Sequence, residues 1–209
     1  MTTTLESWWQ MWRVLAMAPS ADLAHVHAAL LAAYAEPQRH YHSVQHLREC
    51  LALWPQLRHL SEHPGEVELA LWLHDAIYDP PAHDNEARSA EWARRIALDA
   101  GAGTTVAQRV VDLVMATRHA GQPHSIDAQL LVDVDLAILG APGARFDEYE
   151  QQIACEYAWV APDAYRSGRT RVLQSFLARP RIYHSGPCFE QFEASARENL
   201  SRSIAALIT

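Results

Sequence analysis

The chain has few cysteines, and their spacing excludes two common kinds of site. Only Cys50, Cys155 and Cys188 occur in 209 residues, and no two of them form a C-x-x-C pair. A disulfide framework and a cysteine-rich zinc site are therefore not expected, and a reducing cytoplasm is the favoured compartment.

Long apolar runs and basic charge are also scarce. No window reaches the roughly 18 uninterrupted apolar residues that a transmembrane helix needs, and the start MTTTLESWWQ lacks the basic-then-apolar pattern of a signal peptide. The net charge of −8 argues against a nucleic-acid polymer, which favours a basic surface. We expect neither a membrane nor a nucleic-acid partner. A small phosphorylated substrate bound at a local cationic site fits this composition, and self-association into a homo-oligomer is left open.

Alternating strand patterns are missing as well, and the apolar periodicity is helical nearly throughout. Proline, glycine and capping residues separate the expected helices, which span residues 5–17, 20–35, 43–54, 65–78, 84–99, 104–119, 125–139, 145–160, 162–178 and 187–206. We predict an all-α single domain of about nine to ten helices over residues 1–209, either a bundle or an orthogonal array. Its core is expected at about 38–140, with the helices of 145–206 packed on it.

Histidines and a carboxylate interrupt the apolar pattern in the first half of the chain. His42 and His46 share one helix face if their helix begins near Tyr41. His74 and Asp75 are expected in the middle of an apolar helix, in the run ALWLHDAIYD. A buried carboxylate is costly unless it is paired or bound to a metal. The pattern therefore indicates a partner for Asp75 inside the core.

The same interruption recurs in the run LLVDVDLAIL, which contains Asp133 and Asp135. Three expected helices thus direct histidine or aspartate towards an interior, which is how helical proteins usually build a metal site. Imidazole and carboxylate ligands suit Fe, Mn, Zn, Ni or Co, with Mg as a candidate for a second site, and would not select Ca. A lone core histidine is more often hydrogen-bonded than bound to a metal, so it is the combination of the three patterns that favours a metal site.

The order H…HD…D on helices resembles the HD superfamily of metal-dependent phosphohydrolases. One bacterial subgroup of HD-type phosphohydrolases of about this length is similar over roughly residues 30–205, through the runs RHYHSVQH, LWLHDAIYDP, NEARSA, DVDLAILG, EYAWV and YRSGRTRVLQSFLAR. Tyr41-His42 with His46 also resembles the Y-H-N-x-x-H element of cyclic-nucleotide phosphodiesterases. Ser43 stands here where that element has Asn.

This resemblance implies a set of metal ligands: His46, His74, Asp75 and one later aspartate. Asp135 is preferred over Asp133, because Asp135 and the leucine after it match the Asp-Leu pair of related members. The two aspartates are also about 200° apart around a helix, so they are not expected to face the same ion.

Four further residues are assigned from the resemblance and from their chemistry. His42 is the expected proton donor to the leaving group, or else a partner of a ligand. Glu86 orients the attacking water or binds a second ion, or simply complements the dipole of its own helix. Arg39 is a candidate phosphate contact. His119 is a candidate phosphate contact or second-metal ligand, or a cation that favours the end of its helix.

The expected function is hydrolysis of a small phosphate ester, such as a nucleotide or another phosphorylated metabolite, by a metal-activated water. One alternative is a di-iron HD-type oxygenase, which needs extra ligands such as Glu86 and His119. Another is a binding module that holds a metal or a ligand without turnover. A purely structural helical protein with satisfied core histidines is the last alternative.

Overall fold

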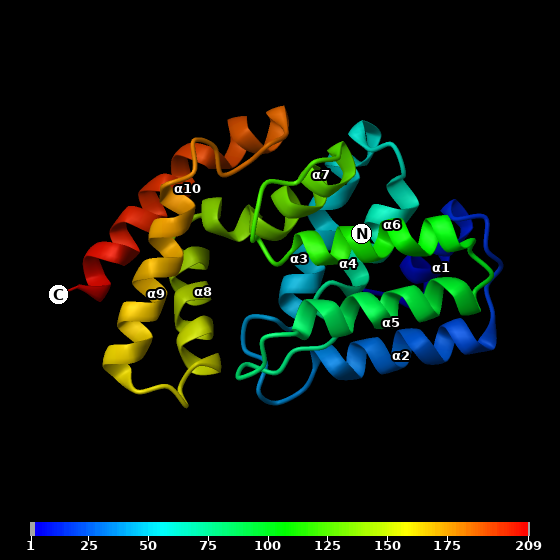
Figure 1. Ribbon diagram of the computed structural model, residues 1–209, viewed down its shortest axis with the longest axis horizontal. Helices are drawn as coiled ribbons and strands as arrows, with labels where there is room; N and C mark the ends of the chain where they lie inside the picture. Colours follow the sequence, from blue (N-terminus) through cyan, green and yellow to red (C-terminus); the bar gives the residue numbers. More distant parts are fainter. Residues whose placement is uncertain (1–2, 209) are drawn as a thin grey trace. The chain divides into compact units, whose positions relative to one another are not determined.

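The computed structural model describes residues 3–208, and this part of the chain contains ten α-helices, two 3-10 helices and no strand (Figure 1). The predicted all-α class with about ten helices is confirmed. Its contacts divide the chain into two compact units, Met1–Val132 and Asp133–Thr209. That the units form one domain stays a prediction. None of the described helices combines the length and the apolar character needed to cross a membrane.

The first unit is arranged around α4, in which every residue from Gly65 to Leu73 is buried. Helices α1, α3, α5 and α6 all contact α4. The bounds of the elements are α1 Leu5–Val14, α2 Ala21–Tyr34, α3 Val44–Leu57, η1 Arg58–Leu60, α4 Pro64–Leu73, α5 Asn85–Asp99, α6 Thr104–Ala116 and α7 Ile126–Asp135, the last of which continues into the second unit.

Serine side chains begin three of these helices, as the sequence predicts. Ser20 accepts a hydrogen bond from the backbone N–H of Leu23, and Ser43 accepts one from Gln45. Ser125 accepts one from Ala128 at the start of α7. Each hydroxyl satisfies a backbone donor that the first helical turn leaves unpaired.

The N-terminal helix α1 packs on the core through its tryptophans. Trp8 and Trp12 are fully buried, and the Trp8 indole donates to the carbonyl of Leu23 over 2.8 Å. The Trp8 ring also meets Trp72 of α4 edge-to-face at 5.3 Å. Helix α1 is therefore a part of the core of the first unit.

The end of α3 differs from the expected one, because this helix does not stop at Trp54. It passes through Pro55 and ends at Leu57. Proline lacks only its own N–H, so close to a helix end it removes a single backbone hydrogen bond. Extending the helix buries Leu57, which offsets that loss.

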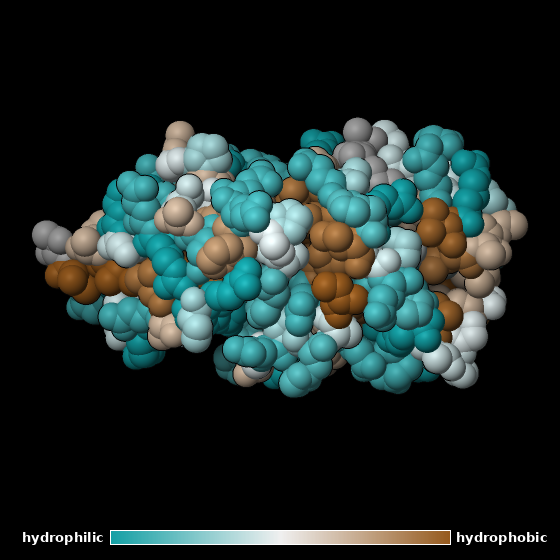
Figure 2. All heavy atoms as spheres, turned by 90° about the horizontal axis from the view of Figure 1, so that it is seen from above, coloured by the Kyte–Doolittle hydropathy of each residue, from teal (hydrophilic) through white to brown (hydrophobic). Residues whose placement is uncertain are grey.

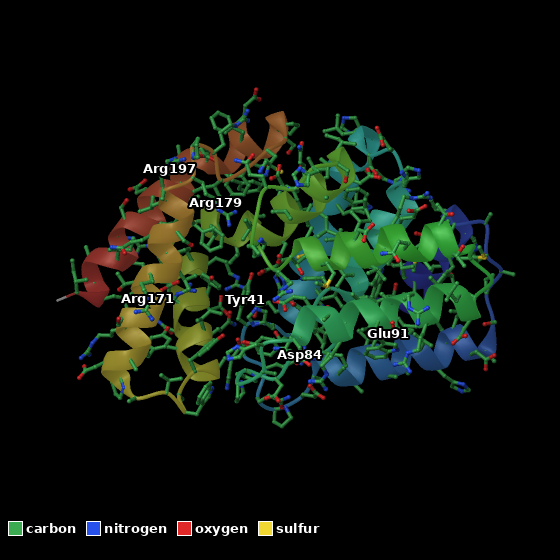
Figure 3. All side chains as sticks on the ribbon, in the orientation of Figure 1. Tyr41, Asp84, Glu91, Arg171, Arg179 and Arg197 are labelled. Carbon is green, nitrogen blue, oxygen red and sulfur yellow. The ribbon has the colours of Figure 1, made fainter. Side chains whose placement is uncertain are left out.

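The second unit contains η2 Leu136–Gly140, α8 Gly143–Glu156, α9 Pro162–Leu177 and α10 Gly186–Leu207. Helix α10 packs against both η2 and α9. At Gly140 an added Cβ would lie 2.6 Å from the Cβ of Phe192, so this approach of α10 requires glycine. Arg197 of α10 donates to the carbonyl oxygen of Arg179 in the segment after α9 (Figure 3).

The visible surface agrees with a chain whose apolar residues are mostly inside. Seen from above, hydrophilic side chains cover most of the face, and apolar residues form smaller areas (Figure 2). The largest fully buried side chains include Trp8, Trp12, Trp54 and Trp72, all from the first unit.

Candidate metal centre

His74 and Asp75 lie in a turn directly after α4, which ends at Leu73. Their expected place in the middle of a helix is therefore wrong. Side chains from other elements satisfy the turn's backbone: the N–H of Asp75 donates to the Tyr34 hydroxyl over 3.3 Å, and that of Ile77 donates to the Ser89 hydroxyl over 3.0 Å. These partners satisfy two partly buried backbone donors of the turn where the helix ends.

Arg39 ties the same turn to the loop before α3. Its Nη1 donates to the carbonyl oxygen of Asp75 over 2.6 Å, and its Nη2 donates to that of Ala76 over 3.0 Å. Nη1 also donates to the carbonyl oxygen of His42. The side chain is fully buried and its Nε pairs with Glu36. These donors hold the backbone of the turn, and the predicted phosphate contact of Arg39 stays a prediction.

Replacing Arg39 by Lys should lower the free energy of unfolding by about 1–2 kcal/mol, because one ammonium cannot serve the same set of carbonyls as a planar guanidinium. Chemical denaturation of metal-free protein measures this loss. The exposed Arg95→Lys is the control and should leave stability unchanged. An unaltered stability together with weakened phosphate binding would favour the predicted phosphate contact over this structural role.

Three of the predicted ligands converge within the first unit. His46 Nε2 lies 3.0 Å from His74 Nε2. Asp75 Oδ2 lies 3.4 Å from the first nitrogen and 3.1 Å from the second. With metal–ligand bonds of about 2.0–2.1 Å, neighbouring ligand atoms are ~3.0 Å apart in an octahedral site and ~3.4 Å apart in a tetrahedral one. The separations observed here fit a single ion of this kind.

The tautomer of His74 is fixed in the form that a metal ligand needs. Its Nδ1 lies 2.8 Å from the carbonyl oxygen of Leu71. A carbonyl oxygen only accepts, so Nδ1 carries a proton, and in the neutral imidazole Nε2 keeps its lone pair. Hydrogen bonds of this type commonly orient the imidazoles of metal sites.

The charge of Asp75 is maintained by its neighbours. Burial alone raises the pKa of this carboxyl group, but His74, His42 and His46 together hold the pKa below its usual range. A carboxylate among imidazoles is ready to bind a cation without first losing a proton.

His42 lies in the turn before α3, since that helix begins at Val44 and not near Tyr41. The shared helix face with His46 is thus not formed. The ring of His42 nevertheless lies near His46, with centroids 6.2 Å apart, and stacks on Tyr78 at 4.1 Å. Its role as a proton donor stays a prediction.

The two later aspartates differ in what surrounds them. Asp133 is fully buried, and its carboxylate accepts hydrogen bonds from the backbone N–H groups of His184 and Ser185 and from the Ser185 hydroxyl. It therefore caps the segment that leads into α10. Asp135 is the last residue of α7 and belongs to the second unit. Its place among the ligands stays a prediction.

Glu86 and His119 lie on two other elements. Glu86 occupies the first turn of α5. His119 follows α6, which ends at Ala116 and not at the expected residue 119, and has the left-handed φ of 51°. Among residues 3–208, neither belongs to a group whose ligand atoms converge. Their predicted roles at a second ion or at the substrate stay predictions.

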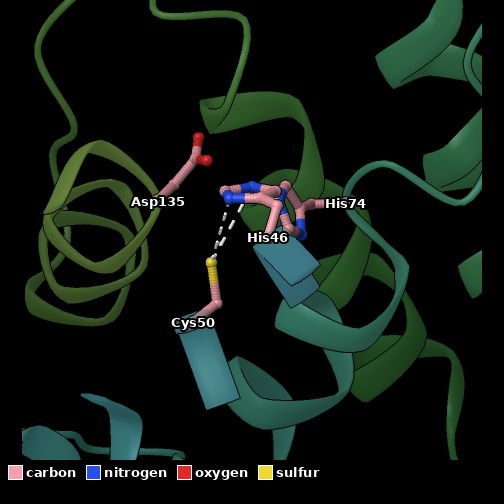
Figure 4. A group of neighbouring side chains, drawn as sticks. All are labelled: His46, Cys50, His74 and Asp135. Carbon is pink, nitrogen blue, oxygen red and sulfur yellow. Dashed lines mark hydrogen bonds between the residues drawn. The ribbon is translucent and has the colours of Figure 1, made fainter. Parts of the chain in front are cut away.

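Sequence reasoning missed three residues of this centre. The hydroxyls of Tyr34 and Ser89 hold the turn that contains His74 and Asp75, called the HD turn below. Ser89 lies within the NEARSA run that carried part of the resemblance. Cys50 is the third. Its Sγ lies 3.7 Å from Nδ1 and 3.8 Å from Nε2 of His46 (Figure 4). The sequence feature that could have identified Cys50 is its position one helical turn after His46.

A second group of possible ligands, Glu62, His63 and Asp127, has a structural explanation. Asp127 accepts hydrogen bonds from the Ser61 hydroxyl and from the backbone N–H groups of Glu62 and His63. This carboxylate therefore fastens the turn that precedes α4 to the start of α7.

No family model, curated protein or solved structure matches the chain. Membership of the HD superfamily therefore stays a prediction that depends on the quoted motifs. The convergence of His46, His74 and Asp75 is a separate observation, and it does not depend on that resemblance.

Proposed function

We propose that this protein is a metal-dependent phosphohydrolase that acts on a small phosphate ester, such as a nucleotide or another phosphorylated metabolite. The observation that carries the proposal is the meeting of two imidazole nitrogens and one carboxylate oxygen within 3.0–3.4 Å of one another. Both histidines are almost wholly buried. Buried polar groups need partners, and an ion would satisfy all three atoms at once.

His46, His74 and Asp75 would hold the ion, and Asp135 is proposed as a further ligand on the strength of the motif order. Asp133 is a poor alternative, because its oxygens already accept hydrogen bonds from the backbone. This mixture of nitrogen and oxygen ligands suits Fe, Mn, Zn, Ni or Co.

When bound, a divalent ion supplies Lewis acidity towards the phosphoryl group and lowers the pKa of a coordinated water. The chain's own residues do the rest. Asp75 brings a negative charge that attracts the ion, and the Leu71 carbonyl keeps His74 in its ligating tautomer. His42 is proposed to protonate the leaving alkoxide, with Tyr78 stacked on its ring to fix its orientation.

The HD turn is held firmly enough to preserve this geometry. Three partners on separate parts of the first unit hold its backbone: Tyr34 at the end of α2, Arg39 in the following loop and Ser89 in α5. Ligands on a turn fixed in this way do not need to be ordered by the ion, which favours tight and selective binding.

Phosphate release by metal-loaded protein tests the proposal. Protein without a histidine tag is stripped with chelator and reloaded with Mn, Co, Zn or anaerobic Fe(II). It is then assayed for phosphate release from nucleoside monophosphates and sugar phosphates, and for conversion of cyclic nucleotides to nucleoside monophosphates. We expect release that depends on the metal, with His42→Gln at least about 100-fold slower, the typical contribution of a general acid. The exposed His59→Gln is the matched control.

Two results would contradict hydrolysis. If stoichiometric metal is bound but no ester in the panel is cleaved, the centre belongs to a binding module. If iron-loaded protein consumes dioxygen with a substrate while releasing no phosphate, the centre is oxidative.

A further inference from the structure

Cys50 lies against the proposed centre on the same helix as His46. It follows that histidine by four residues on α3, and this spacing places two side chains on one helix face. The thiol is almost wholly buried, at 2% relative exposure. Figure 4 shows its sulfur directed towards the His46 ring, where the distances to the two ring nitrogens are 3.7 and 3.8 Å.

The separation of the sulfur from the two imidazole ligands is short enough for a shared ion. One ligand atom each from Cys50, His46 and His74 lies within 4.8 Å of the others. For zinc–sulfur and zinc–nitrogen bonds of about 2.3 and 2.0 Å, a tetrahedral site places sulfur ~3.5 Å from nitrogen. The 3.8 Å between Cys50 Sγ and His46 Nε2 is close to that value.

We propose that Cys50 is a further ligand of this metal centre, bound through its thiolate, with the thiol proton released to solvent when the ion binds. The inference rests on the proposed function, since it concerns the same ion. Thiolate is a soft ligand that favours Zn, Co, Fe and Cd over Mn and Mg. Cys50 would therefore narrow the range of metals that occupy the centre, because histidine and aspartate alone accept a broader range.

The remaining cysteines supply a control for the test. Cys188 in α10 is as buried as Cys50, at 1% exposure, and burial raises the pKa of its thiol to about 11. Cys188→Ser therefore makes the same chemical change in a buried thiol that is proposed to bind no metal. Cys155 is exposed and serves as a second control.

The absorption spectrum of cobalt-loaded protein tests the proposal directly. A thiolate bound to Co²⁺ gives an intense near-ultraviolet charge-transfer band that nitrogen and oxygen ligands do not give. We expect this band in the wild type, in Cys188→Ser and in Cys155→Ser, and we expect it to be lost in Cys50→Ser while weaker visible cobalt bands persist. Competition titrations should show that Cys50→Ser lowers Zn²⁺ affinity by about 10-fold or more and changes Mn²⁺ affinity far less. Cys50→Ala serves if the serine variant does not fold.

Two outcomes would overturn the proposal, and they are distinguishable. If cobalt binds and shows its visible bands but the wild type lacks the charge-transfer band, the thiol is not a ligand and the proposed function is unaffected. If cobalt and zinc do not bind at all, the metal centre and the proposed function fail together.

Discussion

Replacing Asp75 by Asn should lower the affinity of the protein for the proposed transition metal by more than about 100-fold, because even an outer partner of a metal ligand contributes 10–100-fold. The substitution keeps the shape of the side chain and removes its charge. Asp75 contacts both His46 and His74. Elemental analysis of untagged protein after equilibrium dialysis measures the loss, and phosphate release should fall with it.

Asp79→Asn is the matched control for this experiment. Asp79 lies four residues further along the chain and is exposed, so removing its charge tests whether any nearby carboxylate has the same effect. We expect its metal content to equal that of the wild type. If Asp75→Asn also kept its metal, Asp75 would be an ion-pair partner of the histidines and the proposed ligand set would be wrong.

The ligands could be proposed from sequence because their placement conflicts with an apolar core. A histidine and an aspartate inside the run ALWLHDAIYD need partners there, and few arrangements supply them. The exact place of this pair was not predictable, since the apolar residues continue through Tyr78 with helical spacing. Helix α4 ends at Leu73 because Tyr34, Arg39 and Ser89 satisfy the backbone beyond it.

The contacts that Arg39 makes were not predictable from the sequence either. An arginine beside a histidine-rich segment is chemically suited to phosphate, and nothing local distinguishes that role from a structural one. What decides is the position of the carbonyl oxygens of Asp75 and Ala76, which are 36 and 37 residues away in the chain. Such long-range contacts depend on the fold and leave no spacing pattern.

Helix identities were predictable for a different reason, which is that their signals are local. A capping serine such as Ser20 or Ser125 and an apolar repeat both act within a few residues. The conversion of the helix to η2 after Asp135 was missed. That change accompanies contacts within the second unit, where α10 packs against η2 and Asn199 donates to the carbonyl oxygen of Leu139.

Glu68 is a buried acid that the proposed centre does not use. It lies in α4 and is fully buried, and neither carboxylate oxygen has a hydrogen-bond partner of normal geometry within residues 3–208. Burial raises the pKa of Glu68 to about 7, although the charge of Arg58 and the nearby Trp54 indole act in the opposite direction. The folded protein therefore keeps a proton on Glu68 that the unfolded chain would release near pH 4.5.

We expect Glu68→Gln to raise the free energy of unfolding by about 3 kcal/mol at pH 8 and to change it little at pH 4. At pH 4 the carboxyl group is protonated in both states, and Gln is equivalent to it. Between about pH 4.5 and 7 only the unfolded wild type ionises, so the wild type loses stability as the pH rises while the variant does not. Above about pH 7 the difference is complete. Urea unfolding of both proteins at four pH values gives the difference curve, in which the titrations of the histidines cancel.

Glu66→Gln is the control that separates this effect from any general response to removing a charge from α4. Glu66 is also buried, but Arg109 donates to both of its oxygens, over 2.7 and 2.5 Å. Neutralising it removes a charge-assisted pair and should lower the free energy of unfolding by about 1–2 kcal/mol at pH 8. The two neighbouring substitutions are thus expected to have opposite signs. If Glu68→Gln were destabilising at pH 8 as well, the Glu68 carboxylate would have to be ionised and paired in the folded protein.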